Sequence, residues 1–283
     1  MKDSGRNPSS SVLSPQEVHK ARTTARLAIF EAGSYIREKF ESQGLQVESK
    51  GVSDYVTEVD RFCEELILKR LRSSFPDHTL MSEERAVENH SPSHVWIVDP
   101  LDGTTNFIHG FPMIAISIAL AVRGTVVMGW VFDPLRRELF EVHQGVGAWC
   151  NDRPLPSIPQ KPLHEALLAT GFPFRSKKFL DPYLQVFKEV FAEVTGIRRA
   201  GSAALDLAYV AAGRVQGFWE IGLKPWDIAA GALLIQETKG LVTDFWGRSA
   251  YLESGHIVAG SSLVHRFLLE KIEPLREALG PIL

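Results

Sequence analysis

The most informative segment of the chain reads Trp96-Ile97-Val98-Asp99-Pro100-Leu101-Asp102-Gly103-Thr104-Thr105-Asn106. Apolar residues typical of a β-strand lead to Asp99, Pro100 cannot donate a ladder hydrogen bond, and Asp102-Gly103 favours a turn. We therefore expect both aspartates to converge beyond a strand, where their oxygens suit Mg²⁺. The backbone N–H groups of Gly103, Thr104 and Thr105 follow at an expected helix start, a place that favours phosphate.

A capped turn explains the same segment without any chemistry, because Asp and Gly are common turn residues. Two other motif classes are excluded. The spacing lacks the Asp-x-Asp pair of phosphatases that form an aspartyl-phosphate, and it lacks the alternating acids and downstream Glu of a calcium loop. A magnesium site and a structural turn therefore both remain open for this segment alone.

Upstream of this segment the sequence predicts two helices. Ser14-Pro15-Gln16-Glu17 combines an N-cap serine, a proline at the first helical position and a glutamate three residues after the cap. It starts a helix that extends to about Phe40 and that Gly44 ends. A second helix begins near Thr57 and stops before Pro76. Residues 47–55 between them are expected to form a polar loop.

Downstream, the pattern changes from strands to alternating helices and strands. Residues 96–98, 114–122, 126–132, 139–142 and 147–150 predict an antiparallel meander. Helices over residues 183–194, 203–212 and 226–238 then alternate with strands over 197–199, 215–220 and 241–245, and a last strand and helix occupy 257–279.

These patterns predict an α+β half followed by an α/β half. We expect residues 1–13 to be a disordered tail and residues 14–283 to form one domain, with sub-domains of about 14–155 and 156–283, because no linker rich in Pro, Gly or Ser separates them.

Composition indicates an ordinary globular protein. The net charge of −3 provides no basic face for nucleic acid and no polybasic membrane anchor. The longest apolar stretch, residues 113–122, is too short to span a bilayer, and the N-terminus has no signal-peptide core. Two cysteines are too few for a disulfide framework, so a reducing cytoplasm is the expected location.

Three other acidic positions have simple structural explanations when each is considered alone. Glu83 lies in an acidic pair that solvent would hydrate. Asp60, three residues after Thr57, fits a helix cap, and Asp227 fits the first turn of the helix that starts near Trp226.

Considered together, five motifs make the chain resemble the inositol monophosphatase family, part of the fructose-1,6-bisphosphatase-like superfamily, from about Val18 to Glu273. They occur in order at residues 54–60, 83–84, 96–106, 201–203 and 226–231. The resemblance implies a layered αβαβα sandwich, commonly a homodimer. It also implies lithium-sensitive, Mg²⁺-dependent hydrolysis of a phosphorylated polyol, with inositol monophosphate as the leading substrate.

The resemblance further implies roles for individual residues. Glu83, Asp99 and the carbonyl of Leu101 would hold one Mg²⁺, while Asp99, Asp102 and Asp227 would hold a second, and a weaker third ion would use Glu83 and waters. Thr104, with Asp60 behind it, would orient and deprotonate the attacking water, and the amides of Gly103 and Thr104 would bind the phosphate. Glu220 would accept hydrogen bonds from sugar hydroxyls, and the same substrate pocket would include Glu83, Asp102, Gly201, Ser202, Ala203 and Asp227. Lys50 would lie on a mobile loop that closes near the site.

Several alternatives stay open at this point. Fructose-1,6-bisphosphatase, 3′-phosphoadenosine-5′-phosphate phosphatase and histidinol-phosphatase would share the metal site, and a regulatory protein that binds partners through its surface is a non-enzyme alternative. Arg85 departs from the usual Gly-Glu-Glu-Ser pattern of the family and adds a charge near the entrance. Apart from the pocket that the resemblance implies, Ser202 is interpreted as an ordinary turn serine and Cys150 as a buried small hydrophobe.

Overall fold

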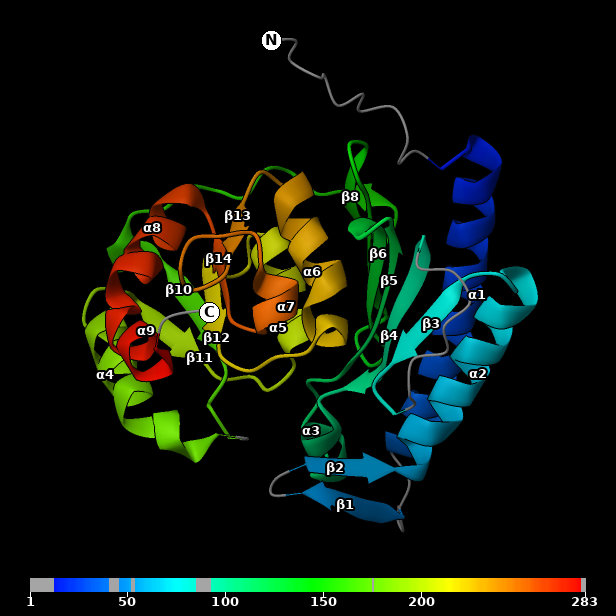
Figure 1. The fold of residues 1–283 in the computed structure, drawn as a ribbon, viewed down its shortest axis with the longest axis horizontal. Helices are drawn as coiled ribbons and strands as arrows, with labels where there is room; N and C mark the ends of the chain where they lie inside the picture. Colours follow the sequence, from blue (N-terminus) through cyan, green and yellow to red (C-terminus); the bar gives the residue numbers. More distant parts are fainter. Residues whose placement is uncertain (1–12, 41–45, 52–53, 85–92, 175, 281–283) are drawn as a thin grey trace, which may run out of the picture.

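The computed structural model describes residues 13–40, 46–51, 54–84, 93–174 and 176–280 of the chain. Its helices and sheets stack in layers, from left to right in Figure 1: outer helices, a five-stranded sheet, central helices, a seven-stranded sheet and the two N-terminal helices. This arrangement is the αβαβα sandwich that the resemblance implies, so the predicted fold class is confirmed.

Both predicted N-terminal helices form one outer layer. Helix α1 (Pro15–Phe40) begins at the predicted cap, where Glu17 N donates to Ser14 Oγ and Ser14 N donates to Glu17 Oε2. Helix α2 (Glu58–Ser74) begins after Thr57, whose Oγ1 accepts from the N–H of Val59. Gly44, expected to end the first helix, lies outside the described residues.

The polar loop predicted for residues 47–55 is wrong. Strands β1 (Val47–Gly51) and β2 (Asp54–Thr57) form a small antiparallel hairpin there. The hairpin is held by backbone pairing, and its few apolar residues alternate too weakly to predict a strand from sequence.

The seven-stranded sheet contains the predicted meander. Its spatial order is β3 (Thr79–Ser82), β4 (His94–Asp102), β5 (Ala115–Val122), β6 (Thr125–Asp133), β7 (Glu138–His143), β8 (Gly147–Cys150) and β9 (Arg153–Pro154). Strands β4 to β8 are antiparallel neighbours as predicted. Strand β3 was not predicted, and it pairs with β4 in parallel. Every residue of β5 is buried, because helices cover both faces of the sheet.

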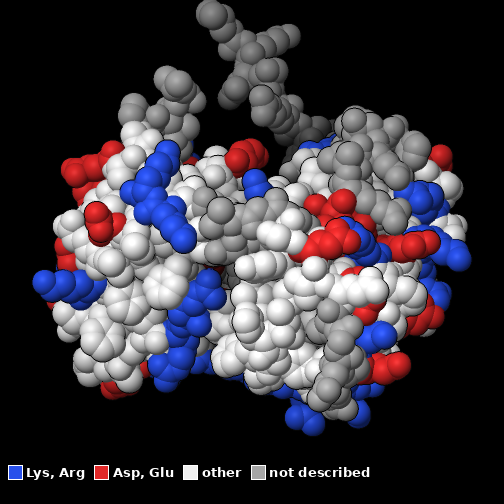
Figure 2. Space-filling view, turned by 90° about the horizontal axis from the view of Figure 1, so that it is seen from below, with Lys and Arg blue, Asp and Glu red and all other residues white. Residues whose placement is uncertain are grey.

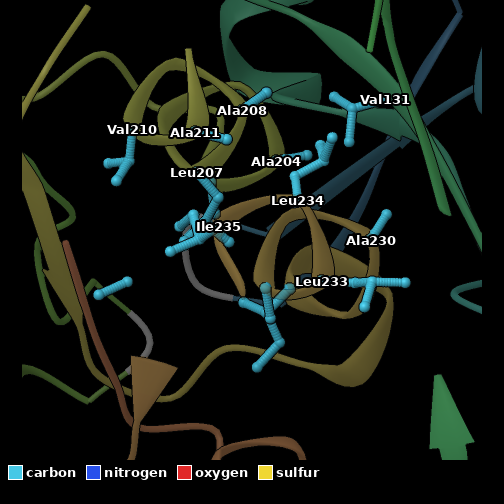
Figure 3. Close-up of a cluster of buried hydrophobic side chains, with 14 of the residues drawn as sticks. Val131, Ala204, Leu207, Ala208, Val210, Ala211, Ala230, Leu233, Leu234 and Ile235 are labelled. Carbon is cyan, nitrogen blue, oxygen red and sulfur yellow. The ribbon is translucent and has the colours of Figure 1, made fainter. Parts of the chain in front are cut away.

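Two helices, α5 (Ala203–Ala211) and α6 (Pro225–Glu237), separate the sheets. They approach closely at Gly231, where an added Cβ would lie 2.5 Å from Cβ of Leu207. Figure 3 shows this core, in which Leu234 of α6 and Ala204 of α5 lie near Val131 of the seven-stranded sheet. The small side chains of both helices therefore fix the distance between the two sheets.

The five-stranded sheet has the order β11 (Gly196–Arg198), β10 (Leu167–Thr170), β12 (Gly217–Glu220), β14 (Ile257–Gly260) and β13 (Leu241–Thr243). Strand β10, which was not predicted, runs parallel to β11 and β12, whereas β14 runs antiparallel to both of its neighbours. Helices α4 (Leu180–Phe191), α8 (Ser262–Lys271) and α9 (Glu273–Leu279) form the outer layer on this side, and the short α7 (Tyr251–Ser254) precedes β14.

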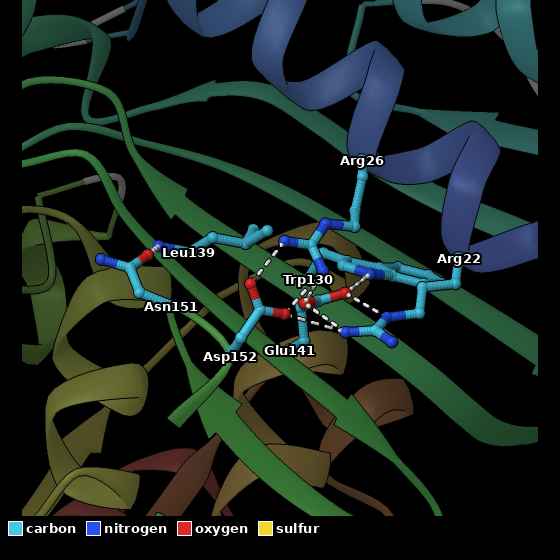
Figure 4. A network of polar contacts seen from close by, with 7 residues as sticks. All are labelled: Arg22, Arg26, Trp130, Leu139, Glu141, Asn151 and Asp152. Atoms are coloured by element: carbon cyan, nitrogen blue, oxygen red, sulfur yellow. Dashed lines mark hydrogen bonds and ion pairs between the residues drawn. The ribbon is translucent and has the colours of Figure 1, made fainter. Parts of the chain in front are cut away.

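A polar network attaches α1 to the seven-stranded sheet (Figure 4). Arg22 and Arg26 of α1 both form ion pairs with Glu141 of β7, whose side chain is only 5% exposed. Glu141 also accepts from Nε1 of the buried Trp130 at 3.0 Å, and both arginines reach Asp152. A buried carboxylate with this many partners fixes the helix to the sheet. No helix in the described part of the chain has the length and apolar character needed to cross a membrane.

Candidate active site

A cavity of about 210 Å³ lies beyond the ends of strands β4, β10 and β12. It is lined by most of the predicted site residues, namely Glu83, Asp99, Leu101, Asp102, Gly103, Thr104, Gly201, Ala203, Glu220 and Asp227. Asp60 and Ser202 lie just behind this lining and contact it through hydrogen bonds. Lys50 belongs to β1, but its side chain is not among those described, and Arg85 lies outside the described residues.

A bulge in β4 directs the two central aspartates. Asp99 pairs with Ser117 of β5, and Asp102 pairs with Ala115, so β4 has one more residue than its partner over this stretch. The strand predicted over residues 96–98 therefore continues to Asp102. Pro100 occupies the bulge, where its missing N–H costs no ladder bond. The bulge turns Asp102 toward the cavity that Asp99 already faces.

Asp99 is 1% exposed and lies among other acids. Burial raises its pKa well above the ordinary range, and the negative charges of Glu83, Asp102 and Asp227 raise it further. The backbone N–H of Leu101, which donates to Asp99 Oδ1 at 3.0 Å, opposes this shift. A cation bound in the cavity would remove this repulsion.

Ser202 is more than an ordinary turn serine. It is completely buried, and its Oγ donates to Asp102 Oδ2 at 2.6 Å. The backbone N–H of Ala204 donates to the same oxygen at 2.8 Å. Since Ser202 caps α5, the first turn of that helix holds the Asp102 carboxylate and joins the two halves of the chain. The hydrogen bond between Ser202 and Asp102 could not be predicted from sequence, because the two residues are 100 positions apart in the chain.

Asp60 and Thr104 form the second polar group of the site. Thr104 Oγ1 lies 2.8 Å from Asp60 Oδ1 and donates to it, while Asp60 Oδ2 accepts from the backbone N–H of Thr57 at 2.8 Å. Burial raises the pKa of Asp60, whereas the hydrogen bonds from Thr57 and Thr104 hold it down. Asp60 thus has both its predicted capping role and a contact with the cavity.

Glu64 was not singled out from sequence, although it lies one helical turn after Asp60 on α2. It is 1% exposed, and its Oε1 accepts from Ser82 Oγ and, at 3.1 Å, from the backbone N–H of Glu84. These two donors flank Glu83 in the chain. Glu64 therefore fixes the segment that presents Glu83 to the cavity, and the spacing of four residues from Asp60 was the signal that could have revealed it.

Glu220 ends β12 and is 6% exposed. Burial raises its pKa well above the ordinary value, Asp206 of α5 raises it further, and the positive charge of Arg199 opposes both effects. Asp227 lies in the first turn of α6, where its Oδ2 accepts from the backbone N–H of Lys224 at 2.7 Å. One short connection thus carries both acids.

Two glycines with a left-handed backbone conformation complete the cavity wall. Gly103 precedes the five-residue helix α3 (Thr104–Ile108) with a φ of 90°, and Gly201 has a φ of 88°. Asn106 Nδ2 donates to the carbonyls of Met113 and Ala200 at 2.7 and 2.9 Å, which holds the two glycine segments together. The predicted helix start after Gly103 is confirmed.

The donor atoms at the cavity are chemically suited to magnesium. They are carboxylate oxygens and a backbone carbonyl, the ligands that this hard cation prefers. As the side chains stand, no group of three or more His, Cys, Asp or Glu among the described residues is arranged so that it could hold a metal ion. Binding of an ion would therefore require the carboxylates to move toward one another.

Charge on the face around β1 and β2 is unevenly distributed. Figure 2 shows basic side chains along one lobe beside the central hollow and a group of acidic side chains on the other lobe. Arg199, which is exposed and lines the cavity, supplies positive charge at its edge. A negatively charged substrate would be attracted to that side first.

Elsewhere in the described part of the chain, the two cysteines are free. Cys63 is buried and Cys150 is half-buried, so the prediction that Cys150 is buried is wrong.

Comparison with known proteins places this geometry in a family. The chain matches the model of the inositol monophosphatase family over residues 17–278. It is 49% identical to Nus factor SuhB of Pseudomonas aeruginosa over 235 residues, which are 81% of this chain and 87% of that protein. Solved structures that are similar to it include the following two. The extragenic suppressor protein suhB from Bartonella henselae has a TM-score of 0.86 and 40% identity, covering 89% of this chain and 98% of its own. The IMPase of Thermotoga maritima has a TM-score of 0.82 and 31% identity, covering 92% and 99%.

Proposed function

The chain belongs to the inositol monophosphatase family, and on that basis we propose that it is a magnesium-dependent phosphatase that hydrolyses a small phosphate monoester. Inositol monophosphate is the proposed substrate. Fructose 1,6-bisphosphate, 3′-phosphoadenosine 5′-phosphate and histidinol phosphate are the competing substrates.

One observation carries this proposal: a single small cavity collects Glu83, Asp99, Asp102 and Asp227 beside the Thr104–Asp60 pair. Mutually repelling, largely buried carboxylates are costly unless a cation joins them. In the proposed arrangement Glu83, Asp99 and the Leu101 carbonyl would hold one Mg²⁺, and Asp99, Asp102 and Asp227 would hold a second. When bound, such ions supply Lewis-acid stabilisation of the phosphate and lower the pKa of water.

The protein groups would position the reactants. The Thr104 hydroxyl donates a hydrogen bond to Asp60, so the lone pairs of Thr104 Oγ1 can accept a hydrogen bond from the attacking water. Burial raises the pKa of Asp60. Asp60 is therefore able to take up the proton of the attacking water through the Thr104 hydroxyl. The backbone N–H groups of Gly103 and Thr104 would bind phosphate oxygens, and Glu220 would accept hydrogen bonds from the hydroxyls of the leaving group.

A substrate panel tests the proposal. Purified protein with saturating Mg²⁺ should release phosphate from inositol monophosphate with a higher kcat/KM than from the three competing substrates. A higher value for one of the others would keep the phosphatase class and change the substrate. Absence of release from every phosphate monoester would reject the class.

A second candidate function comes from the relatives. The 49% identical protein of Pseudomonas aeruginosa is named a Nus factor, so we propose that this chain also binds a transcription complex through its surface. The homodimer that the family resemblance implies is part of this proposal. The test is co-sedimentation of wild-type protein and Asp99→Asn with purified transcription complexes. Equal binding by both would show that this role is independent of catalysis, and absence of binding by both would remove it.

A further inference from the structure

Gly171 lies beside Glu220 because of the strand register. Strands β10 and β12 are parallel neighbours, and Thr170 at the end of β10 pairs with Trp219 of β12. Gly171 and Glu220 are the next residues along each strand, and both line the cavity. Side chains at adjacent positions of parallel strands point to the same face of a sheet. A side chain at position 171 would therefore compete with Glu220 for the same space.

The Glu220 carboxylate occupies that space. A Cβ added to Gly171 would lie 1.9 Å from Cδ and Oε1 of Glu220 and 2.1 Å from Oε2. Among the described glycines, none has a shorter contact of this kind. Gly171 is not among the residues with a positive φ, so its backbone conformation does not require glycine. The three atoms nearest to the added Cβ all belong to the Glu220 carboxylate.

The strands leave little room for Gly171 to move away. Thr170 Oγ1 donates to the Trp219 carbonyl at 2.8 Å and lies 3.1 Å from the hydroxyl of Tyr183. Thr170, Trp219 and Tyr183 are completely buried. A larger residue at position 171 would therefore displace the end of the Glu220 side chain rather than the sheet.

We propose that Gly171 is a positioning residue that sets the place of the Glu220 carboxylate and so determines the preference for polyol phosphates. The inference rests on the proposed function. In Gly171→Ala the carboxylate must retreat by about 1.5 Å to reach an ordinary contact of 3.4 Å. Displacements of about 1 Å can cost a hundredfold in rate. The proposed metal-binding carboxylates do not contact Gly171 in this way, so the loss should depend on the substrate.

The experiment compares Gly171→Ala with the control Gly196→Ala. Gly196 lies in β11 of the same sheet, where an added Cβ would meet nothing closer than 3.6 Å. kcat and KM are measured at saturating Mg²⁺ for inositol monophosphate and for 4-nitrophenyl phosphate, which has no ring hydroxyls. For Gly171→Ala we expect kcat/KM to fall about ten- to a hundredfold for inositol monophosphate and less than about threefold for the aryl ester. Gly196→Ala should match the wild type on both.

A double variant separates positioning from a general effect on the fold. Glu220→Asp shortens the side chain by one methylene group, which leaves room for a methyl group at position 171. Gly171→Ala combined with Glu220→Asp should therefore lose less inositol phosphatase activity than the two single losses multiplied. If Gly171→Ala alone does not fold, a folded double variant supports the inference and an unfolded one overturns it.

Other outcomes contradict the inference directly. Equal losses for both substrates would mean that Gly171 supports the site as a whole, and no loss would mean that Glu220 tolerates displacement. If the wild type hydrolyses the aryl ester but not inositol monophosphate, the polyol preference itself fails. If it hydrolyses neither, the proposed phosphatase function fails, and the inference fails with it.

Discussion

Asp60, Asp99 and Glu220 are each at most 6% exposed, yet their surroundings differ. Asp60 accepts hydrogen bonds from two threonines, Asp99 faces three other acids, and Glu220 lies near both Asp206 and Arg199. The hydroxyl donors around Asp60 suit a group that transfers a proton, and the acids around Asp99 suit a cation-binding group. The opposite charges near Glu220 suit a group that binds a neutral polar ligand. At the scale of single residues, these surroundings separate the three proposed roles.

Glu220→Gln tests the substrate-reading role. Gln keeps the shape and removes the charge, which weakens each charge-assisted hydrogen bond to a ring hydroxyl by about 1.5–3 kcal/mol. We expect kcat/KM for inositol monophosphate to fall by roughly one to two decades and that for 4-nitrophenyl phosphate to change little. Parallel kinetics on both substrates at saturating Mg²⁺ provide the measurement. Similar losses on both would assign Glu220 to support of the metal site instead.

At the scale of elements, helix α2 is central because it carries Asp60 and Glu64 one turn apart, both buried on the side of the site. Asp60 holds Thr104 after the bulge of β4, and Glu64 holds the segment around Glu83 after β3. One rigid helix thus sets the relative position of the two parts of the proposed metal site.

Glu64→Met should weaken metal binding. The variant keeps the side-chain volume but removes the acceptor of Ser82 Oγ and Glu84 N, and loss of such outer partners typically costs about 10–100-fold in metal affinity. Titration of Mn²⁺, followed by the electron paramagnetic resonance of the free ion, measures this without catalysis. Glu65→Met, the same change at an exposed neighbour, is the control. Equal Mn²⁺ affinities for the two variants would show that Glu64 does not support the metal site.

The corner between α2 and β3 predicts a pH effect on stability. Trp96 Nε1 donates to Nδ1 of His78, and burial lowers the pKa of His78 from 6.5 to about 4, with a further contribution from His94. The unfolded chain therefore binds a proton more readily than the folded chain between these values. The stability contributed by the neutral ring is complete above pH 6.5 and is lost as the pH falls toward 4.

His78→Gln, which keeps an acceptor for Trp96, should lose less stability than the wild type between pH 7 and pH 5. Urea denaturation of both proteins at the two pH values gives the comparison. Identical losses would show that His78 does not contribute to the acid sensitivity of the fold.

Elements differed in how well sequence predicted them. Helices α1 and α2 have capping residues at their starts, so their first turns could be read directly. Strand β10 has four residues without alternation and exists because β11 and β12 pair with it on either side. Asp99 and Asp102 could be predicted as site residues because both lie in the motif at residues 96–106. The roles of Ser202 and Gly171 depend on partners far away in the chain, and no local pattern encodes such contacts.

At the scale of the whole molecule, the proposed site joins both halves of the sandwich. Asp99 and Asp102 come from the seven-stranded sheet, whereas Asp227 and Glu220 come from the region around β12 and α6. The bonds from Ser202 to Asp102 and from Asn106 to Ala200 already cross between the halves. An ion held by acids from both should therefore stabilise the fold as a unit.

Magnesium should raise the melting temperature of the wild type. A ligand at a hundred times its Kd stabilises the folded state by about 2.7 kcal/mol. Differential scanning calorimetry with chelator and with increasing Mg²⁺ measures the effect, and Asp102→Asn should show a smaller rise. A melting temperature that does not depend on Mg²⁺ in the wild type would contradict a site shared between the halves.

The most direct test of the central claim is the release of phosphate from inositol monophosphate over a Mg²⁺ series, with wild type and Asp99→Asn measured in parallel. We expect no release by the wild type in excess chelator and full activity on adding Mg²⁺. Asp99→Asn should stay inactive throughout, while its metal-free melting temperature equals or exceeds that of the wild type, because one charge has left a cluster of repelling acids. Full turnover in excess chelator, or a near-normal kcat for Asp99→Asn, would contradict the claim.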